Sequence, residues 1–198
     1  MTSFRVSFDY RCPFAKNIHL HVVAGLRAGA PWEVEFVPWT LSQVHREEGD
    51  IDVWDDPAQD EQLLALAVGV SVRDQQPDLF LAAHDALFRA RHEGSVRLAT
   101  LGEINEVLSP IGVDLAAVRA DVISRRPHTV IGENFRDFER YEAFGVPTFV
   151  VDEVATFVRY MVAPAGDDAQ SIKVIESLLD LMASEPELNE FKRTKIPY

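Results

Sequence analysis

The stretch from residue 5 to residue 15, RVSFDYRCPFA, joins an alternating β-prone segment directly to Cys12 and Pro13. The alternation predicts a strand over residues 5–10. Residues 14–26 then carry apolar side chains at helical spacing, and proline is typical of the first helical position. Residues 32–37 alternate again, so the first forty residues predict a strand–helix–strand unit with parallel strands.

The middle of the chain predicts a loop and helices but no strand. Residues 41–60 are acidic and irregular and predict a loop. The next stretch contains no convincing strand, and its spacing of apolar residues predicts a run of helices over 58–68, 77–92, 98–108 and 114–124. We therefore expect an inserted helical domain over residues 58–127.

The last third of the chain returns to mixed elements. Residues 129–144 predict a helix, and residues 145–151, GVPTFVV, predict a turn that runs into an apolar strand. A turn at Asp152-Glu153 leads to a second, antiparallel strand over 155–162. A final helix begins after Asp167 or Asp168 and ends at Met182, and residues 184–198 are polar and expected to fray.

The order of elements indicates the fold class. Without the helical block it is βαβ-αββα, the order of the thioredoxin fold. The predicted class is α/β, a thioredoxin fold with an inserted all-helical subdomain, in which residues 1–45 and 128–198 form the thioredoxin-like domain.

Composition narrows the partners. The 198 residues carry a net charge of −13 with a sequence pI near 4.8, which disfavours nucleic acid and anionic membrane surfaces. No apolar run approaches the roughly 20 residues that cross a bilayer, and the first residues lack the pattern of a secretory signal. We expect a cytoplasmic protein. A homodimer through the helical block or the last helix is compatible with this pattern, but no residue specifies it.

Cys12 is the one cysteine of the chain, which excludes an intramolecular disulfide and a cysteine-rich metal cluster. A lone cysteine is often a small buried apolar side chain. Here it lies between a strand and a helix, at or near the helix N-cap, where free amides and nearby Arg11 and Lys16 favour a thiolate of lowered pKa. Asp9 would oppose this if its carboxylate came close.

Pro147 is unexpected inside an apolar strand, because proline removes a hydrogen bond of the ladder. A cis Val146–Pro147 peptide bond is one explanation, and an ordinary trans proline at a strand start is the other. The histidines suggest no metal site: His19 and His21 point in different directions on a helix, and His84 and His92 are expected at a helix surface or boundary. We expect no bound metal and no bound cofactor.

Together, residues 9–15 and residues 145–149, GVPTF, resemble the two active-site segments of DsbA-like proteins, whose thioredoxin fold is interrupted by a helical domain. Residues 86–94 and 111–114 resemble that family's helical segment. Within this family, the resemblance is greatest to cytoplasmic FrnE-type oxidoreductases. Kappa-class glutathione transferases and hydroxychromene-carboxylate isomerases share the architecture.

The resemblance implies a set of site residues. Cys12 would be the nucleophile and Pro147 a cis proline packed against its sulfur. Pro13, Phe14, Ala15, Val146 and Thr148 would bind substrate, with Val146 offering backbone groups to an extended chain.

The chain departs from the family at Ala15. The redox members of the family have a resolving cysteine three residues after the first, so here an external thiol must resolve any mixed disulfide. We therefore expect a thiol-dependent oxidoreductase acting through a single cysteine, by monothiol disulfide exchange or thiol transfer. Its co-substrate would be a low-molecular-weight thiol, and its substrate a small or protein thiol or disulfide.

Two other functions stay open. A kappa-like transferase or isomerase would use the helix N-terminus to stabilise the thiolate of bound glutathione or a similar thiol. A redox-inactive protein that binds peptides would have lost the chemistry together with the second cysteine. The sequence identifies neither the substrate nor the small thiol.

Overall fold

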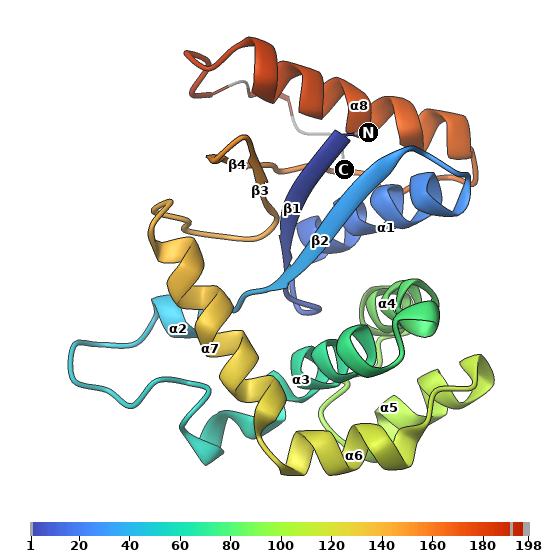
Figure 1. The fold of residues 1–198 in the computed structure, drawn as a ribbon, viewed down its shortest axis with the longest axis vertical. Coiled ribbons are helices and arrows are strands. Elements are labelled where there is room, and N and C mark those ends of the chain that lie inside the picture. The colour runs from blue at the N-terminus through green and yellow to red at the C-terminus, as the bar shows by residue number, and fades with distance from the viewer. Residues whose placement is uncertain (1, 191, 196–198) are drawn as a thin grey trace.

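The computed structural model describes residues 2–190 and 192–195 and, within them, a sheet of four strands in the order β2-β1-β3-β4 (Figure 1). The strands are β1 (Thr2–Phe8), β2 (Trp32–Pro38), β3 (Thr148–Val151) and β4 (Val154–Phe157). β1 and β2 run parallel, while β3 is antiparallel to both β1 and β4. α1 (Pro13–Arg27) connects the two parallel strands, as the alternating pattern at the N-terminus predicts.

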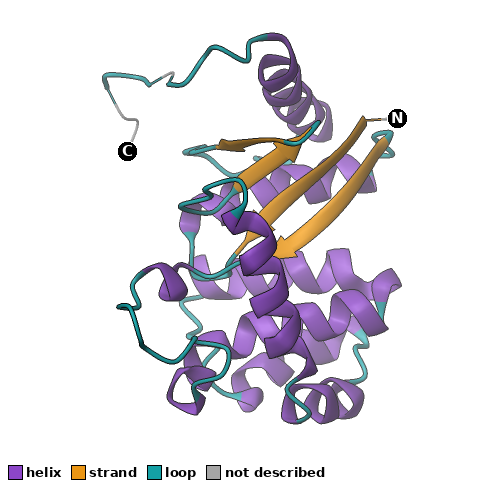
Figure 2. Cartoon of the chain, turned by 60° about the vertical axis from the view of Figure 1, so that its left-hand side comes forward, coloured by secondary structure: helices purple, strands orange, loops and turns teal. Residues whose placement is uncertain are grey.

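The remaining helices fall into two groups. α8 (Asp168–Ser184) packs against α1 beside the sheet, and α7 (Arg126–Glu139) runs from the helical part of the molecule back to β2. The others belong to the segment between β2 and α7, and most of them lie below the sheet in Figure 2. They are α2 (Leu41–Val44), α3 (Asp60–Gln75), α4 (Pro77–His92), α5 (Leu101–Leu108) and α6 (Leu115–Ile123), with short 3₁₀ turns at Pro57–Gln59 and Ser109–Ile111.

This arrangement confirms the predicted fold class, a thioredoxin fold with a helical insertion. Several boundaries differ. β4 ends at Phe157 and not at 162, because the carbonyls of Tyr160 and Val162 accept hydrogen bonds from side chains of α1 and not from a neighbouring strand. The expected division into two domains at residue 128 stays a prediction, and that residue lies within the first turn of α7.

Other expected elements shift by a few residues. The expected loop over 41–60 contains the short helix α2, and α5 begins after Thr100, whose side chain forms a capping box with Glu103. Beyond α8, residues 185–190 and 192–195 lie outside helices and strands, and the rest of the expected frayed tail lies outside the described residues.

The central strand β1 explains why the N-terminal pattern is so apolar. Val6 and Phe8 are fully buried, and Phe4 stacks on Phe149 of β3 with ring centroids 5.6 Å apart. The three tryptophans of the chain are all buried in the core as well. β1 is therefore a firmly packed support that ends one loop before Cys12.

A buried polar chain joins the helical part to this support. The Tyr10 hydroxyl lies 2.8 Å from His84 Nδ1 of α4, His84 Nε2 lies 2.9 Å from His19 Nδ1 of α1, and His19 Nε2 lies 3.0 Å from the Ser7 carbonyl oxygen. All three side chains are at most 1% exposed. The expectation that His84 lies at a helix surface or boundary is therefore wrong. His84 lies on the same face of α4 as apolar residues that pack into the core, so it is buried with them.

The geometry determines which nitrogen of His19 and of His84 carries a hydrogen in this hydrogen-bonded series. A carbonyl only accepts, so His19 Nε2 carries a hydrogen and His19 Nδ1 accepts from His84 Nε2–H. His84 Nδ1 then accepts from the Tyr10 hydroxyl. Both imidazoles are neutral, each nitrogen is paired, and burial lowers the pKa of His19 to about 4 and that of His84 well below its usual value.

We predict that the two buried histidines make the free energy of unfolding decrease in mild acid. The unfolded histidines bind protons near pH 6.5, whereas the folded ones resist protonation, so stability is complete above pH 6.5 and falls as the pH drops toward 4. With its pKa lowered to about 4, His19 should remove about 2 kcal/mol of unfolding free energy between pH 7.5 and pH 5, and His84 should add a loss of the same sign. Urea unfolding across this range measures the effect.

Two variants separate this effect from general acid sensitivity. The double variant Tyr10→Phe with His84→Leu removes one titrating group and its donor, so its stability should depend less steeply on pH. His45→Gln, at an exposed position, should keep the steep dependence of the parent. A parent protein with equal stability at pH 7.5 and pH 5 would contradict the assignment of neutral buried histidines.

Candidate active site

Cys12 is the N-cap of α1. Its backbone is extended, its amide donates to the Asp9 carbonyl oxygen at 3.0 Å, and Lys16 N–H donates to the Cys12 carbonyl oxygen at 3.0 Å. Pro13 has no N–H, so the first amides available to the sulfur belong to the next two residues, and the Ala15 amide lies 3.5 Å from Cys12 Sγ. The thiol is half-buried.

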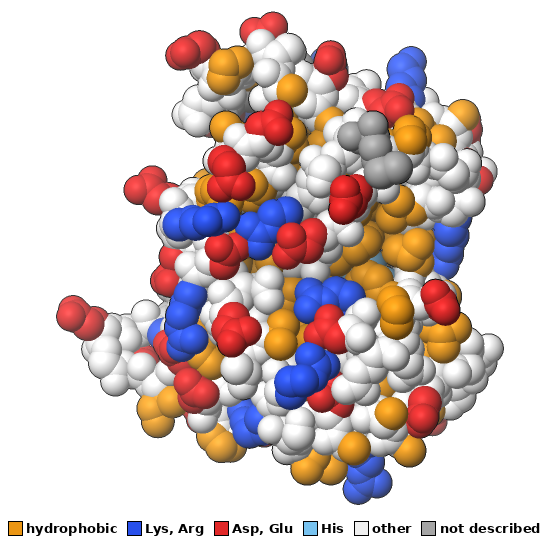
Figure 3. All heavy atoms as spheres, in the orientation of Figure 1, with side chains coloured by type: hydrophobic (Ala, Val, Ile, Leu, Met, Phe, Trp, Pro, Cys, Tyr) orange, Lys and Arg blue, Asp and Glu red, His pale blue; other side chains and the backbone are white. Residues whose placement is uncertain are grey.

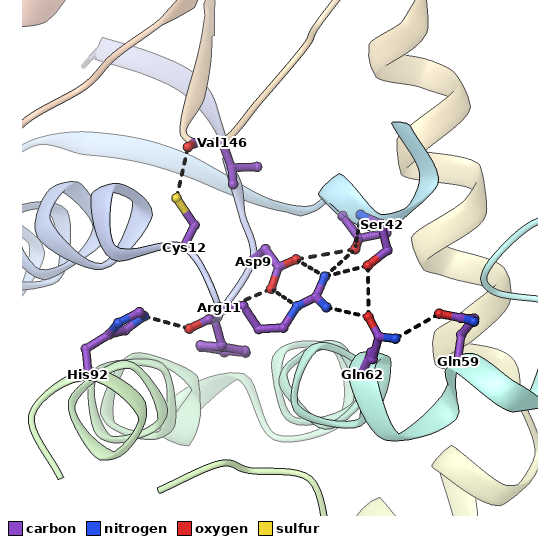
Figure 4. A network of polar contacts seen from close by, with 10 residues as sticks. Asp9, Arg11, Cys12, Ser42, Gln59, Gln62, His92 and Val146 are labelled. Atoms are coloured by element: carbon purple, nitrogen blue, oxygen red, sulfur yellow. Dashed lines mark hydrogen bonds and ion pairs between the residues drawn. The ribbon is translucent and has the colours of Figure 1, made fainter. Parts of the chain in front are cut away.

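The sulfur faces the loop between α7 and β3. Cys12 Sγ donates to the Val146 carbonyl oxygen at 3.3 Å, as Figure 4 shows. The Val146–Pro147 peptide bond is cis. The loop is tied to the sheet, because the Thr148 amide donates to Ser7 Oγ at 2.8 Å and the Thr148 hydroxyl donates to the Gly145 carbonyl oxygen at 2.8 Å. The start of α1 and the loop before β3, which are far apart in the sequence, are thus in contact at the Cys12 sulfur.

The thiol pKa differs from the expectation. Burial raises the pKa of the Cys12 thiol, and the Asp9 carboxylate raises it further. The amides of Ala15 and Phe14 and the charge of Arg159 lower it, but burial outweighs them. The predicted lowering of the pKa is therefore wrong, since helix-end amides act on a sulfur that has lost part of its hydration. At neutral pH Cys12 is a protonated thiol whose hydrogen points at Val146.

The two cations expected beside the sulfur are engaged elsewhere. Arg11 turns away from Cys12, and its Nη2 lies 3.1 Å from Asp9 Oδ2 and 2.7 Å from the Ser42 hydroxyl (Figure 4). The same guanidinium donates to Gln62 of α3 at 2.9 Å. Lys16 Nζ lies 3.6 Å from a Glu93 carboxylate oxygen. Arg11 therefore bridges the buried Asp9 of the active-site loop and Gln62 of α3.

The expected substrate-binding residues divide into two groups. Pro13 is exposed and Phe14 is partly exposed, so both lie on the surface next to the sulfur. Ala15 and Thr148 are buried, and Val146 is 5% exposed with its carbonyl oxygen at the thiol. The binding of substrate by these five residues stays a prediction, and burial of the Ala15 and Thr148 side chains leaves them backbone groups with which to make it.

Arg159 is the site residue that the sequence analysis missed. Its guanidinium carbon lies 4.3 Å from the centroid of the Phe14 ring. The hairpin register contains a signal that could have found it. Phe157 pairs with Thr148, and the Val158 amide donates to the Pro147 carbonyl oxygen at 3.0 Å, so Arg159 falls opposite Val146.

Among residues 2–190 and 192–195, no group of three or more His, Cys, Asp or Glu side chains is arranged to hold a metal ion. A search of the same residues for a helix long and apolar enough to span a bilayer finds none.

Solved structures share this architecture. The cytosolic disulfide reductase DsbM from Pseudomonas aeruginosa superposes with a TM-score of 0.62 at 13% identity, over 90% of this chain and 99% of the other. MdbA, a thiol-disulfide oxidoreductase from Actinomyces oris, gives 0.61 at 17% identity over 88% and 79%. NmDsbA1 from N. meningitidis gives 0.59 at 14% identity over 94% and 86%.

Comparison with curated protein sequences gives no significant match. The family model described as a DSBA-like thioredoxin domain matches residues 5–180, which include both Cys12 and the Val146–Pro147 loop. With the strand order, the helical insertion and the position of the thiol already established, the chain belongs to the DsbA-like thioredoxin domain family.

Proposed function

We propose that this protein is a monothiol disulfide-exchange enzyme, in which Cys12 forms a mixed disulfide with a low-molecular-weight thiol. One observation carries the proposal: the single thiol of the chain is partly exposed at the N-cap of α1 and faces the Val146 carbonyl oxygen at 3.3 Å. A structure of DsbM with GSH superposes with a TM-score of 0.62 at 14% identity, which supports a small thiol as co-substrate.

The reaction needs two exchange steps. Cys12 first loses its proton to solvent, and the amides of Phe14 and Ala15 hydrogen-bond the thiolate. The thiolate attacks one sulfur of a disulfide R–S–S–R, forms Cys12–S–S–R and releases R–S⁻. A second thiolate R′–S⁻ then attacks the R sulfur, which releases R–S–S–R′ and restores the Cys12 thiolate. The protein undergoes no net oxidation over the cycle.

The raised pKa sets the character of this exchange. A thiol of high pKa has a small thiolate fraction at neutral pH, but each thiolate is a strong nucleophile and a poor leaving group. Cys12 should therefore hold a mixed disulfide longer than a thiol of low pKa would. This behaviour suits the reducing or thiol-transferring direction, and a free thiol at the site suits the cytoplasm, where thiols are kept reduced.

We predict that oxidised glutathione or 2-hydroxyethyl disulfide gives a single adduct on Cys12, detectable as a 1:1 mass increase of the intact protein. The rate of adduct formation, or of alkylation by iodoacetamide, should rise with pH to a midpoint above about 8.5, the value of an unperturbed thiol. The reason is that burial disfavours the thiolate in the resting enzyme.

Cys12→Ser is the control for this measurement. It should give no adduct, and it also separates the kappa-like alternative, because a serine hydroxyl can still donate a hydrogen bond to a bound thiolate. Glutathione-dependent turnover that survives in Cys12→Ser would favour that alternative. A protein that forms no adduct with either disulfide up to pH 9.5 would be redox-inactive, and the proposal would fail.

We also predict that Ala15→Cys creates the dithiol that the chain lacks. The variant places two cysteines in a Cys-X-X-Cys spacing, with the first at the N-cap of α1 and the second in its first turn, which is the spacing that redox-active disulfides use. On oxidation the new thiol should form an intramolecular disulfide with Cys12. The variant should also accelerate the reduction of insulin by dithiothreitol, which the parent should not do. The added sulfur enters a fully buried position and should lower stability by about 1–3 kcal/mol.

Ala24→Cys is the matched control, because it adds a thiol to the same helix about 18 Å from Cys12. It should form no internal disulfide and leave insulin reduction at the level of the parent. If Ala15→Cys keeps two free thiols under oxidising conditions, the first turn of α1 does not hold the two side chains as this site requires.

A further inference from the structure

Arg159 lies near enough to Cys12 for its charge to act on the thiol, and contacts on both sides of Arg159 fix its position. The residue before it, Val158, donates its amide to the carbonyl oxygen of Pro147 in the loop that faces Cys12. Arg159 itself extends over the ring of Phe14, two residues beyond Cys12, at 4.3 Å. A guanidinium over an aromatic face is stabilised by the ring quadrupole, so this position is preferred even without substrate.

The segment that carries Arg159 is fixed by α1. We call residues 158–163 the strap. Asn17 Nδ2 donates to the Tyr160 carbonyl oxygen at 3.0 Å, and His21 Nε2 lies 3.1 Å from the Val162 carbonyl oxygen. Both α1 side chains are buried, and the rings of His21 and Tyr160 are 5.3 Å apart, edge to face. The strap therefore presents Arg159 at a defined place, although the arginine side chain is exposed.

Arg159 differs from the other cations around Cys12 in that they are paired with carboxylates. Arg11 is paired with Asp9, and Lys16 is paired with Glu93. In the view of Figure 3, Lys and Arg side chains lie largely among Asp and Glu side chains. Arg159 contacts the Phe14 ring and makes no ion pair with a carboxylate of the described residues. In a chain of net charge −13, such a cation at the reactive atom is available to an anionic ligand.

We propose that Arg159 is a specificity residue that binds the carboxylate of an acidic thiol or disulfide while its sulfur reacts with Cys12. The inference rests on the exchange reaction proposed above and names the substrate class. A guanidinium offers two parallel N–H donors that match a carboxylate, and Phe14 keeps the fork oriented. A disulfide with a carboxylate a few bonds from its sulfur can reach both groups at once.

The test compares two small disulfides of similar size. 3,3′-Dithiodipropionic acid carries carboxylates, and 2-hydroxyethyl disulfide carries uncharged hydroxyls. The second-order rate of adduct formation on Cys12 is measured for each, and their ratio, acidic over neutral, is the readout. We expect Arg159→Gln to lower this ratio about fivefold, as for the loss of one charge-assisted contact. Because any change in the reactivity of Cys12 affects both probes, the ratio isolates recognition of the carboxylate.

Three further measurements complete the design. Arg159→Lys keeps the charge and should keep most of the ratio, while Arg119→Gln, exposed on α6 far from the thiol, changes the net charge equally and should leave the ratio unchanged. Added salt should lower the ratio of the parent toward that of Arg159→Gln. A ratio that changes less than twofold in Arg159→Gln overturns this inference. Failure of the parent to react even with 2-hydroxyethyl disulfide instead overturns the exchange function itself.

Discussion

The contact between Cys12 Sγ and the Val146 carbonyl oxygen joins residues 134 positions apart, and the site depends on it. One partner is fixed because Cys12 caps α1, and the other because Thr148 ties its loop to Ser7 of β1. The same contact orients the thiol, since its S–H donates to the Val146 carbonyl oxygen. Burial of the sulfur, together with the nearby Asp9 carboxylate, raises the pKa of that thiol.

The helical insertion supports the same site from the opposite side. Tyr10, two residues before Cys12, donates to His84 of α4, and its ring packs so closely on Gly69 of α3 that a side-chain carbon there would lie 2.6 Å from the Tyr10 hydroxyl. Arg11 is braced against Gln62 of the same helix. Buried polar groups that are fully paired specify one arrangement, because any shift leaves a donor or acceptor unsatisfied. The insertion therefore fixes the loop before the thiol.

Local patterns in the sequence were sufficient to predict the fold and to place Cys12 at the start of a helix. The alternation in residues 5–10, the Cys12-Pro13 junction and the strand after Pro147 indicate the thioredoxin order, because each is a local preference that the global fold shares. The thiol pKa could not be derived this way, since it depends on how much water the folded chain removes from the sulfur. His84 was misplaced for a similar reason: its partners Tyr10 and His19 come from other elements, and no local pattern records them.

The absence of a second thiol changes what the surroundings of Cys12 must do. A dithiol enzyme resolves its own mixed disulfide, so its selectivity is decided in one encounter with substrate. In the proposed exchange cycle, both the disulfide that forms the adduct and the thiol that releases it come from solution and must approach the same site. A group that recognises the small molecule then acts twice in each cycle. For an acidic small molecule, that group would be a cation that the protein's own carboxylates leave unpaired, and among the described residues Arg159 of the strap, over the Phe14 ring, is the residue we propose for this role.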